Sequence, residues 1–392
     1  MGDLESLLLV LAAIYLSECV VWVRRGGVAF HSHRGKTWRF WHPGAVLGNA
    51  RGAMFLANPI PPLGTVLVSH QFPVSFSPQG VISFTAACIN PGWRPAQSAN
   101  HLRYEEARTI AVEGRTLRVN GGLFVKAPSP AVARAQASLL RRLKSIPEIE
   151  RGAVIHAALA EALDGQRVRT RWQRLQAQAR LLRILSNVLF VYLFVLAPVL
   201  LWKFGLRLAG AAVAAGLLAQ TFTIGWCFYR AHRALFPDGA EERFTPFLTM
   251  LLAPPTAIRA HDLLARQLVA TFHPLAPAQA LCPPGAFQDL ARHALRDLHF
   301  PILPTSPHPE IQAVQSEAWF RQAVLEEMEQ AIEQAGLQPA QLLQPPAPLE
   351  PANRSYCPRC ETQFVTAVGT CGDCGGRPLR SFPSEFVTVQ ES

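Results

Sequence analysis

The strongest constraint on this chain is a pair of apolar runs near its middle. The runs cover Ile184–Trp202 and Leu208–Tyr229, and the short segment Lys203–Arg207 separates them. As a helix, the first run would reach about 28 Å, which is close to the thickness of the hydrocarbon core of a bilayer. Its Leu, Ile, Val and Phe residues together contribute about −4 to −8 kcal/mol to membrane insertion. The sequence therefore predicts a transmembrane helical hairpin over residues 184–230.

Another apolar segment, Leu7–Val23, lies at the start of the chain and is followed at once by two arginines. Acidic residues precede it, whereas a secretory signal carries positive charge at that end. Residues 1–25 are therefore predicted to be a membrane anchor, with the N-terminus outside and the basic end in the cytoplasm. The alternative is a short helix in the interface, so the sequence leaves open whether residues 5–23 span the membrane or lie on it.

The basic residues indicate which surface the chain meets. The net charge of +10 suits either nucleic acid or an anionic membrane. Position favours the membrane, because the residues 151–183 that precede the hairpin predict a basic juxtamembrane helix. We expect this helix to contact anionic headgroups, with each arginine contributing about 1 kcal/mol near the surface. The arginines concerned are Arg167, Arg169, Arg171, Arg174, Arg180 and Arg183.

Composition and topology together predict a location. Abundant Arg, Ala and Pro suggest a GC-rich bacterial genome, and the 8 cysteines show no extracellular disulfide pattern. Basic residues flank both outer ends of the hairpin, so the positive-inside rule places its short loop outside and the C-terminus in the cytoplasm. The predicted location is the inner membrane of a bacterium.

Residues 26–150 are predicted to form a small β-rich cytoplasmic domain. Ala53–Ser69 is apolar but contains several prolines, which indicates short strands and turns rather than a spanning helix. Gly114 predicts a β-hairpin, and a helix is expected over about 129–144. This order of strands, hairpins and a closing helix over 70–144 resembles bacterial PH-like domains. The resemblance implies a β-roll that binds partners or lipid and has no catalytic centre.

Histidines are further candidate ligands. His31 and His33 are two residues apart, so on a strand they would lie on the same face, and His42 is nearby. These histidines could bind a metal. The alternative is that they are surface histidines beside the membrane anchor. The histidines beyond the hairpin have spacings that match no metal or hydrolase motif, so we expect structural or solvated roles. These are His261, His273, His293 and His299, with Asp262 and Asp297 beside them.

Residues 317–334 predict an amphipathic helix. Its candidate contact residues are Trp319, Ala323, Met328 and Ile332. A dimer seam is one interpretation, but the segment is too short for three heptads, so packing on its own domain is expected.

The most specific motif lies near the C-terminus. Two CxxC pairs, Cys357 with Cys360 and Cys371 with Cys374, are separated by a spacer long enough for a hairpin. Four thiolates presented by two such turns can close a tetrahedral Zn²⁺ shell with bonds of about 2.3 Å. A redox dithiol is the alternative, although it needs only one pair. Over 354–380 the pattern resembles the zinc-ribbon family with rubredoxin-like knuckles, which implies a structural zinc ion on these four cysteines and a small binding surface.

These features predict an α+β membrane protein with an anchor helix, a β-rich domain, a transmembrane hairpin, a helical region and a C-terminal zinc ribbon. The expected boundaries are 1–25 for the anchor, 26–150 for the β-rich domain, 151–183 for the basic helix, 184–230 for the hairpin, 231–338 for the helical cytoplasmic region, 339–353 for a Pro-rich linker, 354–380 for the zinc ribbon and 381–392 for the tail.

The sequence supports three functional hypotheses. The first is a non-catalytic membrane protein, an adaptor or scaffold, whose cytoplasmic domain and zinc ribbon bind a protein partner. The second is a membrane-bound enzyme with an unrecognised site. The sequence lacks a nucleophile elbow, a phosphate loop and an HExxH motif, which counts against this hypothesis. The third is a membrane-tethered nucleic-acid binder, which the weakly basic C-terminal module disfavours.

Overall fold

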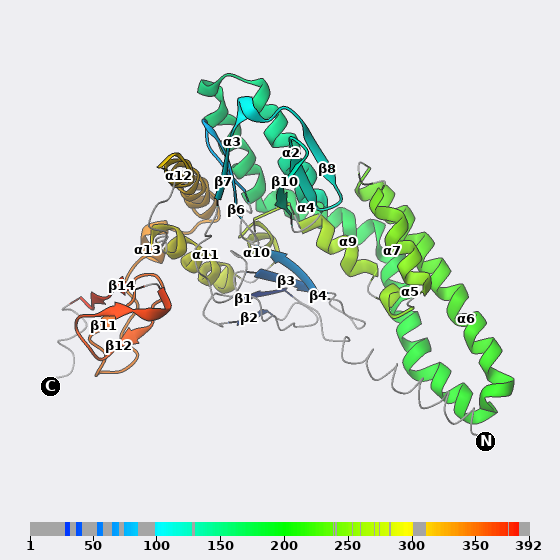
Figure 1. Cartoon of the computed structure of the whole chain (residues 1–392). Helices are drawn as coiled ribbons and strands as arrows, with labels where there is room; N and C mark the ends of the chain where they lie inside the picture. The colour runs from blue at the N-terminus through cyan, green and yellow to red at the C-terminus, as the bar shows by residue number, and fades with distance from the viewer. Residues whose placement is uncertain are drawn as a thin grey trace.

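The computed structural model describes residues 28–31, 37–40, 53–57, 65–69, 74–84, 99–127, 130–237, 239, 241–252, 254–258, 260–269, 271–273, 275–281, 284–300, 311–374 and 376–383. In Figure 1 the hairpin projects from one end of a central body and the C-terminal module lies at the other end. The predicted anchor over residues 1–25 lies outside the described residues, as do His33 and His42.

The first sheet confirms that the proline-interrupted apolar segment forms strands. Its order is β2 (Thr37–Phe40), β1 (Val28–His31), β3 (Ala53–Ala57) and β4 (Thr65–Ser69), and all the pairs are antiparallel. Prolines between β3 and β4 suit the connection, because proline cannot donate to a ladder.

The second sheet is built on a tight turn. β5 (Val74–Phe76), β6 (Gly80–Phe84) and β7 (Ala99–Arg103) pair in that order, and the short helix η2 (Tyr104–Glu106) follows. The Ser77 N–H donates to the Gly80 carbonyl at 2.8 Å and closes the turn between β5 and β6.

The third sheet and its helix follow the prediction closely. β8 (Ile110–Glu113) and β9 (Thr116–Val119) form the hairpin expected around Gly114, and β10 (Gly122–Lys126) completes the sheet. Helix α2 (Pro130–Ser145) then packs on β8 and β9, burying one stripe of residues: Ala133, Ala137, Leu140 and Leu143. Burial at this helical spacing is what holds α2 on the sheet.

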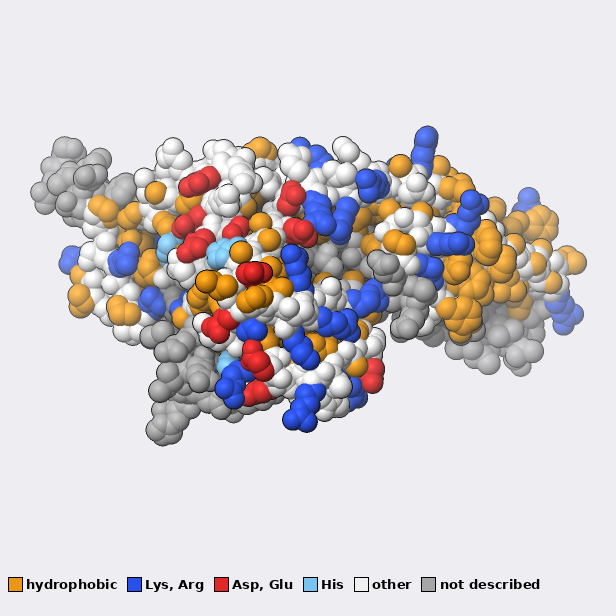
Figure 2. All heavy atoms as spheres, turned by 90° about the horizontal axis from the view of Figure 1, so that it is seen from above, with side chains coloured by type: hydrophobic (Ala, Val, Ile, Leu, Met, Phe, Trp, Pro, Cys, Tyr) orange, Lys and Arg blue, Asp and Glu red, His pale blue; other side chains and the backbone are white. Residues whose placement is uncertain are grey.

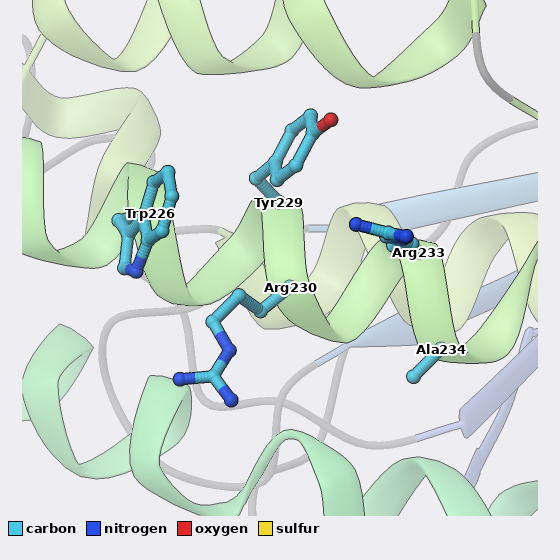
Figure 3. Close-up of a pocket in the computed structure, with 5 residues that line it drawn as sticks. All are labelled: Trp226, Tyr229, Arg230, Arg233 and Ala234. Carbon is cyan, nitrogen blue, oxygen red and sulfur yellow. The ribbon is translucent and has the colours of Figure 1, made fainter.

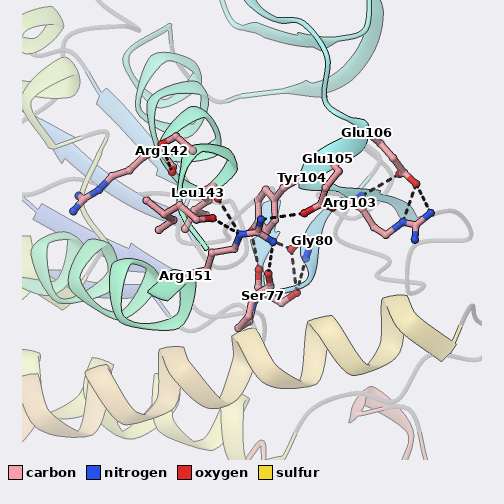
Figure 4. Close-up of polar contacts among 12 residues, drawn as sticks. Ser77, Gly80, Arg103, Tyr104, Glu105, Glu106, Arg142, Leu143 and Arg151 are labelled. Atoms are coloured by element: carbon pink, nitrogen blue, oxygen red, sulfur yellow. Dashed lines mark hydrogen bonds and ion pairs between the residues drawn. The ribbon is translucent and has the colours of Figure 1, made fainter. Parts of the chain in front are cut away.

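A buried arginine ties the second sheet to the helices that follow α2 (Figure 4). The Arg151 guanidinium donates to the carbonyls of Leu143 at 3.0 Å and Pro78 at 3.0 Å, and lies 4.5 Å from the centre of the Tyr104 ring. It also pairs with the exposed carboxylate of Glu105 at 3.0 Å. The Tyr104 hydroxyl donates to the Ser77 carbonyl at 2.7 Å, so the buried polar groups of this contact have partners.

The basic stretch predicted as one helix is divided into consecutive helices. These are α3 (Glu148–Leu163), α4 (Gly165–Gln178) and α5 (Arg180–Val191). The Asp164 carboxylate accepts a hydrogen bond from the Arg167 N–H at 2.9 Å, which caps the start of α4. The break at Asp164 changes the chain direction and lets α4 pack on later helices.

The predicted hairpin is present as helical segments that fold back on one another (Figure 1). α5 continues through one π-helical stretch, η3 (Tyr192–Leu196), into α6 (Ala197–Leu235), and the helical path is broken at Gly205 with φ +73° and ψ 165°. Only glycine adopts this conformation readily. Beyond it α6 returns beside α5, and the Tyr192 hydroxyl donates to the Val213 carbonyl at 2.8 Å. The turn therefore falls inside the predicted Lys203–Arg207 loop.

Helices complete the central body. They are α7 (Glu241–Leu252), α8 (Pro254–Ile258), α9 (Ala260–Val269), α10 (Leu275–Leu281), α11 (Pro284–His299), α12 (Ile311–Gln334) and α13 (Pro339–Leu342). α12 packs on α3, β5 and β6, and buries Ala323, Met328 and Ile332. The amphipathic segment therefore packs within this chain, on α11 of its own predicted region and also on α3, β5 and β6, which lie outside that region. One apolar cluster extends from β5 to α13, so the β-rich and helical regions share a core.

Candidate metal centre and apolar hairpin

The C-terminal module is a set of short strands around four cysteines. β11 (Ser355–Tyr356) pairs with β12 (Gln363–Phe364) and β15 (Arg380–Ser381), while β13 (Thr370–Cys371) pairs with β14 (Arg377–Pro378). A short helical turn, η4 (Gly372–Cys374), carries the last cysteine. The β12–β13 connection folds the two CxxC pairs toward each other, as the spacing predicted.

The four cysteine sulfurs converge on one point. The Sγ atoms of Cys357, Cys360, Cys371 and Cys374 lie within 4.8 Å of one another, and all four residues are buried. Bonds of about 2.3 Å in a tetrahedral shell would place the sulfurs about 3.8 Å apart, so the cluster has the dimensions of a metal site. In the described part of the module, Phe364 and Leu379 pack partly buried against this cluster. Tyr356 and Phe382 form a separate buried pair with ring centres 5.2 Å apart, so the apolar core of the module is small.

Each cysteine pair sits on a turn held by backbone hydrogen bonds. The Glu361 N–H donates to the Cys357 carbonyl at 2.8 Å, and the Gly376 N–H donates to the Cys371 carbonyl at 3.0 Å. Glu361 and Gly376 both have positive φ, at 51° and 78°. These turns aim both thiols of a pair to the same side, which a tetrahedral metal requires.

The thiols also perturb one another. Hydrogen bonds from Cys357 and Cys374 hold the pKa of the Cys360 thiol well below its usual range. Burial raises the pKa of the Cys371 thiol to about 12, and the hydrogen bonds of the Cys374 thiol to Cys357 and Cys360 raise its pKa as well. A metal ion that binds four thiolates must displace the protons of the thiols.

The module is docked on helix α11 through a residue that the sequence did not reveal. Arg296 is 1% exposed, and its guanidinium donates to the Pro358 carbonyl at 2.7 Å and to the Gln344 carbonyl. The same group pairs with the Glu361 carboxylate at 3.1 Å. Pro358 and Glu361 belong to the first cysteine turn, so one buried arginine joins α11, the linker and the metal site.

Further contacts hold the predicted linker in place. The Gln363 side chain donates to the Ala347 carbonyl at 2.7 Å and accepts from the Leu349 N–H at 2.7 Å. Residues 339–342 form α13, and the stretch that follows lies along the cysteine module. Because proline-rich segments are already stiff, fixing them by these few hydrogen bonds costs little conformational entropy.

The histidines beyond the hairpin take separate positions. His261 is buried against Trp172, with the ring centres 6.5 Å apart, and burial lowers its pKa to about 4. His299 lies 3.2 Å from the Glu329 carboxylate. Asp297 accepts a hydrogen bond from Arg359 at 2.9 Å, which adds to the docking of the module. Among the described residues, the four cysteines are the group that could hold a metal ion.

The hairpin is the second unusual feature. Arg180–Leu235 is long and apolar enough to cross a membrane, and 22% of its most apolar window is buried. A core helix of a water-soluble protein would be mostly buried, so this value favours contact with lipid. The exposed large apolar side chains on the hairpin are Leu181, Ile184, Val188, Val191, Val195, Leu196, Val199, Trp202, Phe204, Leu208, Leu218, Phe222 and Trp226.

Charged side chains lie around the hairpin as well as on the body. Figure 2 shows hydrophobic side chains gathered over the projecting hairpin and Lys and Arg side chains where it joins the body. Of the predicted headgroup-binding arginines, Arg169, Arg174 and Arg180 are exposed. Arg171 instead lies 5.0 Å from the centre of the Phe272 ring, and Arg167 pairs with Glu161 at 2.6 Å.

Comparisons with protein-family models, with curated proteins and with solved structures find no match for this chain. The four-cysteine cluster is consistent with a zinc-ribbon-like knuckle on geometry alone. The order of strands and closing helix over 70–144 is the expected one, but its resemblance to PH-like domains stays a prediction.

Proposed function

We propose that this chain is a non-catalytic integral membrane protein whose soluble body carries a zinc ribbon that binds a protein partner. The exposed apolar hairpin is the observation that carries the membrane assignment. Its surface is too large and continuous to face water without association, because exposed apolar patches on soluble monomers rarely exceed a few hundred Å². The partner assignment rests on the small docked module, which lies at the opposite end of the body from the hairpin (Figure 1).

The proposed topology follows from the two ends of the hairpin. The turn at Gly205 faces outward, and the ends that carry Arg183 and Arg230 face the cytoplasm. Residues 1–25 would supply a third span with the N-terminus outside. The location that fits this arrangement is the inner membrane of a bacterium, with headgroup contacts from the exposed arginines of α4 and α5.

Zinc is the proposed metal. Four buried cysteines with their sulfurs within 4.8 Å of one another suit Zn²⁺, because a structural zinc site is tetrahedral and needs no open coordination position. When bound, zinc would supply most of the folding energy of a module with so few apolar contacts.

A fractionation experiment tests the membrane part of the proposal. Full-length protein should stay in the membrane pellet after alkaline carbonate extraction. A reporter inserted at Gly205 should be accessible from outside, and one fused after Ser392 should not. Monodisperse full-length protein in detergent-free buffer would overturn the proposal.

A crosslinking experiment tests the adaptor part. Crosslinked partners recovered from membranes should be compared between the full chain and a chain that ends at residue 338. The expected result is a partner that disappears with the module while the truncated chain remains in the membrane. Identical partners for both chains would contradict a binding role for the zinc ribbon.

A further inference from the structure

One face of α6 combines aromatic and basic side chains around an open hollow (Figure 3). The hollow has a volume of about 440 Å³ and is lined by Trp226, Tyr229, Arg230, Arg233 and Ala234. These positions follow the spacing i, i+3, i+4, i+7 and i+8, so they share one side of the helix. The hollow lies where the second apolar run ends.

The aromatic pair marks the apolar side of this hollow. Trp226 is 52% exposed, and its ring stacks on the Tyr229 ring with centres 6.1 Å apart and planes inclined by 16°. Trp and Tyr concentrate at the boundary between hydrocarbon and headgroups, because each ring is apolar and carries one polar group.

The basic pair marks the polar side. Arg230 and Arg233 are both exposed, and in the described part of the chain neither guanidinium forms an ion pair. A guanidinium binds the oxygens of a phosphate through parallel N–H donors, so each of these arginines can bind a headgroup phosphate.

The height of these residues along the hairpin agrees with a headgroup position. Trp226 lies about 32 Å of helix rise from Gly205, and Arg230 lies about 38 Å from it. A hydrocarbon core of about 30 Å would therefore end near Trp226 and leave Arg230 among the phosphates. Arg183 on the other arm lies about 33 Å from the same glycine, at a matching height.

The face is also open to a ligand from the bilayer. α7 packs beside this face, where a Cβ on Gly225 would lie 2.7 Å from the Phe247 ring. Phe222, one helical turn before Trp226, contacts the same ring with centres 6.0 Å apart. Trp226, Arg230 and Arg233 are nevertheless exposed, so α7 leaves these three positions accessible.

We propose that this face is a binding site for an anionic phospholipid, with Arg230 and Arg233 on the phosphate and Trp226 and Tyr229 beside the glycerol and upper acyl chains. The inference rests on the membrane assignment above and adds a lipid class and named residues. It places the lipid contact on the second arm of the hairpin, in addition to the arginines of α4 and α5.

Native mass spectrometry of the full chain in detergent micelles tests this site. The probes are dioleoylphosphatidylglycerol, dioleoylphosphatidylcholine and inorganic phosphate. Wild-type protein should retain the anionic lipid in preference to the zwitterionic one and should not retain phosphate alone. The double variant Arg230→Gln/Arg233→Gln should lose about thirtyfold in affinity for the anionic lipid, because each arginine near the surface contributes roughly a factor of five.

The matched control is Arg115→Gln/Arg142→Gln, which removes the same charge from exposed positions in the β-rich part. It should bind the anionic lipid as wild-type protein does. The variant Trp226→Leu/Tyr229→Leu, which keeps the arginines, should also weaken binding. Equal retention of both lipids by wild-type protein, equal affinity of the arginine variant, or binding of free phosphate as tightly as lipid would each overturn the site.

Carbonate extraction of the same proteins separates this inference from the membrane assignment. If wild-type protein leaves the membrane on extraction, the proposed function fails. If every variant stays in the membrane but the arginine variant keeps its lipid preference, only the lipid site fails.

Discussion

The cysteine module and the apolar hairpin both need stabilisation from outside their own apolar contacts, but of different kinds. Each has little apolar packing of its own: the module has a small core around the four cysteines and the Tyr356–Phe382 pair, and the hairpin leaves many of its large apolar side chains exposed. A metal ion would complete the module through directional bonds to four atoms, whereas lipid would complete the hairpin through contacts that have no preferred direction. Folding of the module should therefore depend on single residues, whereas membrane insertion of the hairpin should depend on its overall composition.

The largest effect is expected from removing one cysteine. Cys371→Ser should abolish zinc binding, because apparent binding free energies of structural zinc sites are about 10–16 kcal/mol and depend on all four ligands. Limited proteolysis should then cut within 354–382, while carbonate extraction should still leave the protein in the membrane. Cys227→Ser, on the hairpin, is the control and should keep one zinc per chain. Zinc retained at full stoichiometry in Cys371→Ser would contradict the claim that the module depends on single residues.

The next effect concerns the buried contact between α11 and the cysteine module. Arg296→Ala should destabilise docking of the module by about 3–5 kcal/mol, because it leaves the Glu361 carboxylate and two carbonyls without their buried partner. Hydrogen exchange should rise in residues 343–353, while zinc stoichiometry should stay at one. Arg359→Ala, whose partner Asp297 is more exposed, should cost about 1 kcal/mol or less. Similar exchange in both variants would show that Arg296 has no special role.

A pH effect of about 3 kcal/mol is expected at the base of the hairpin. The buried His261 ring has a pKa lowered to about 4, and its two ring nitrogens are buried without hydrogen-bond partners in the described residues. The neutral ring is therefore the folded form, so its contribution is complete above about pH 6.5 and is lost as pH falls toward 4. Thermal unfolding in micelles between pH 7.5 and 4.5 should show a shallower pH dependence for His261→Gln. An unchanged pH dependence would contradict this assignment.

The smallest effect is expected from one charge on the hairpin surface. Val195→Arg places a guanidinium near the middle of the first arm, where insertion of arginine costs about 2.5–3.5 kcal/mol. Because the whole apolar surface contributes to insertion, the fraction extracted by carbonate should rise only partially. Val368→Arg, on an exposed position of the cysteine module, is the matched control and should leave extraction unchanged. Complete loss from the membrane would show that the hairpin depends on single residues after all.

The sequence predicted features that depend on local spacing. The four cysteines, the turn near Gly205 and the hairpin at Gly114 each arise from residues close together in the chain, where spacing alone limits the geometry. The break at Asp164 also had a local signal, since aspartate is a favoured N-cap residue of helices.

Features that depend on distant contacts could not be predicted in this way. Arg296 and Pro358 are 62 residues apart, and nothing near Arg296 distinguishes it from other arginines of amphipathic helices. Likewise, the sequence shows that Trp226, Arg230 and Arg233 share one face of a helix. The exposure of that face, however, depends on where α7 packs.

The docking of the cysteine module gives its two metal-binding turns unequal access to solvent. Pro358 in the first turn is buried against α11, whereas Gly372 and Asp373 in the second turn are exposed. A chelator or an exchanging ion would therefore reach the sulfurs of Cys371 and Cys374 first. Loss of a bound metal would then start from the solvent side and leave Cys357 and Cys360 attached to the body.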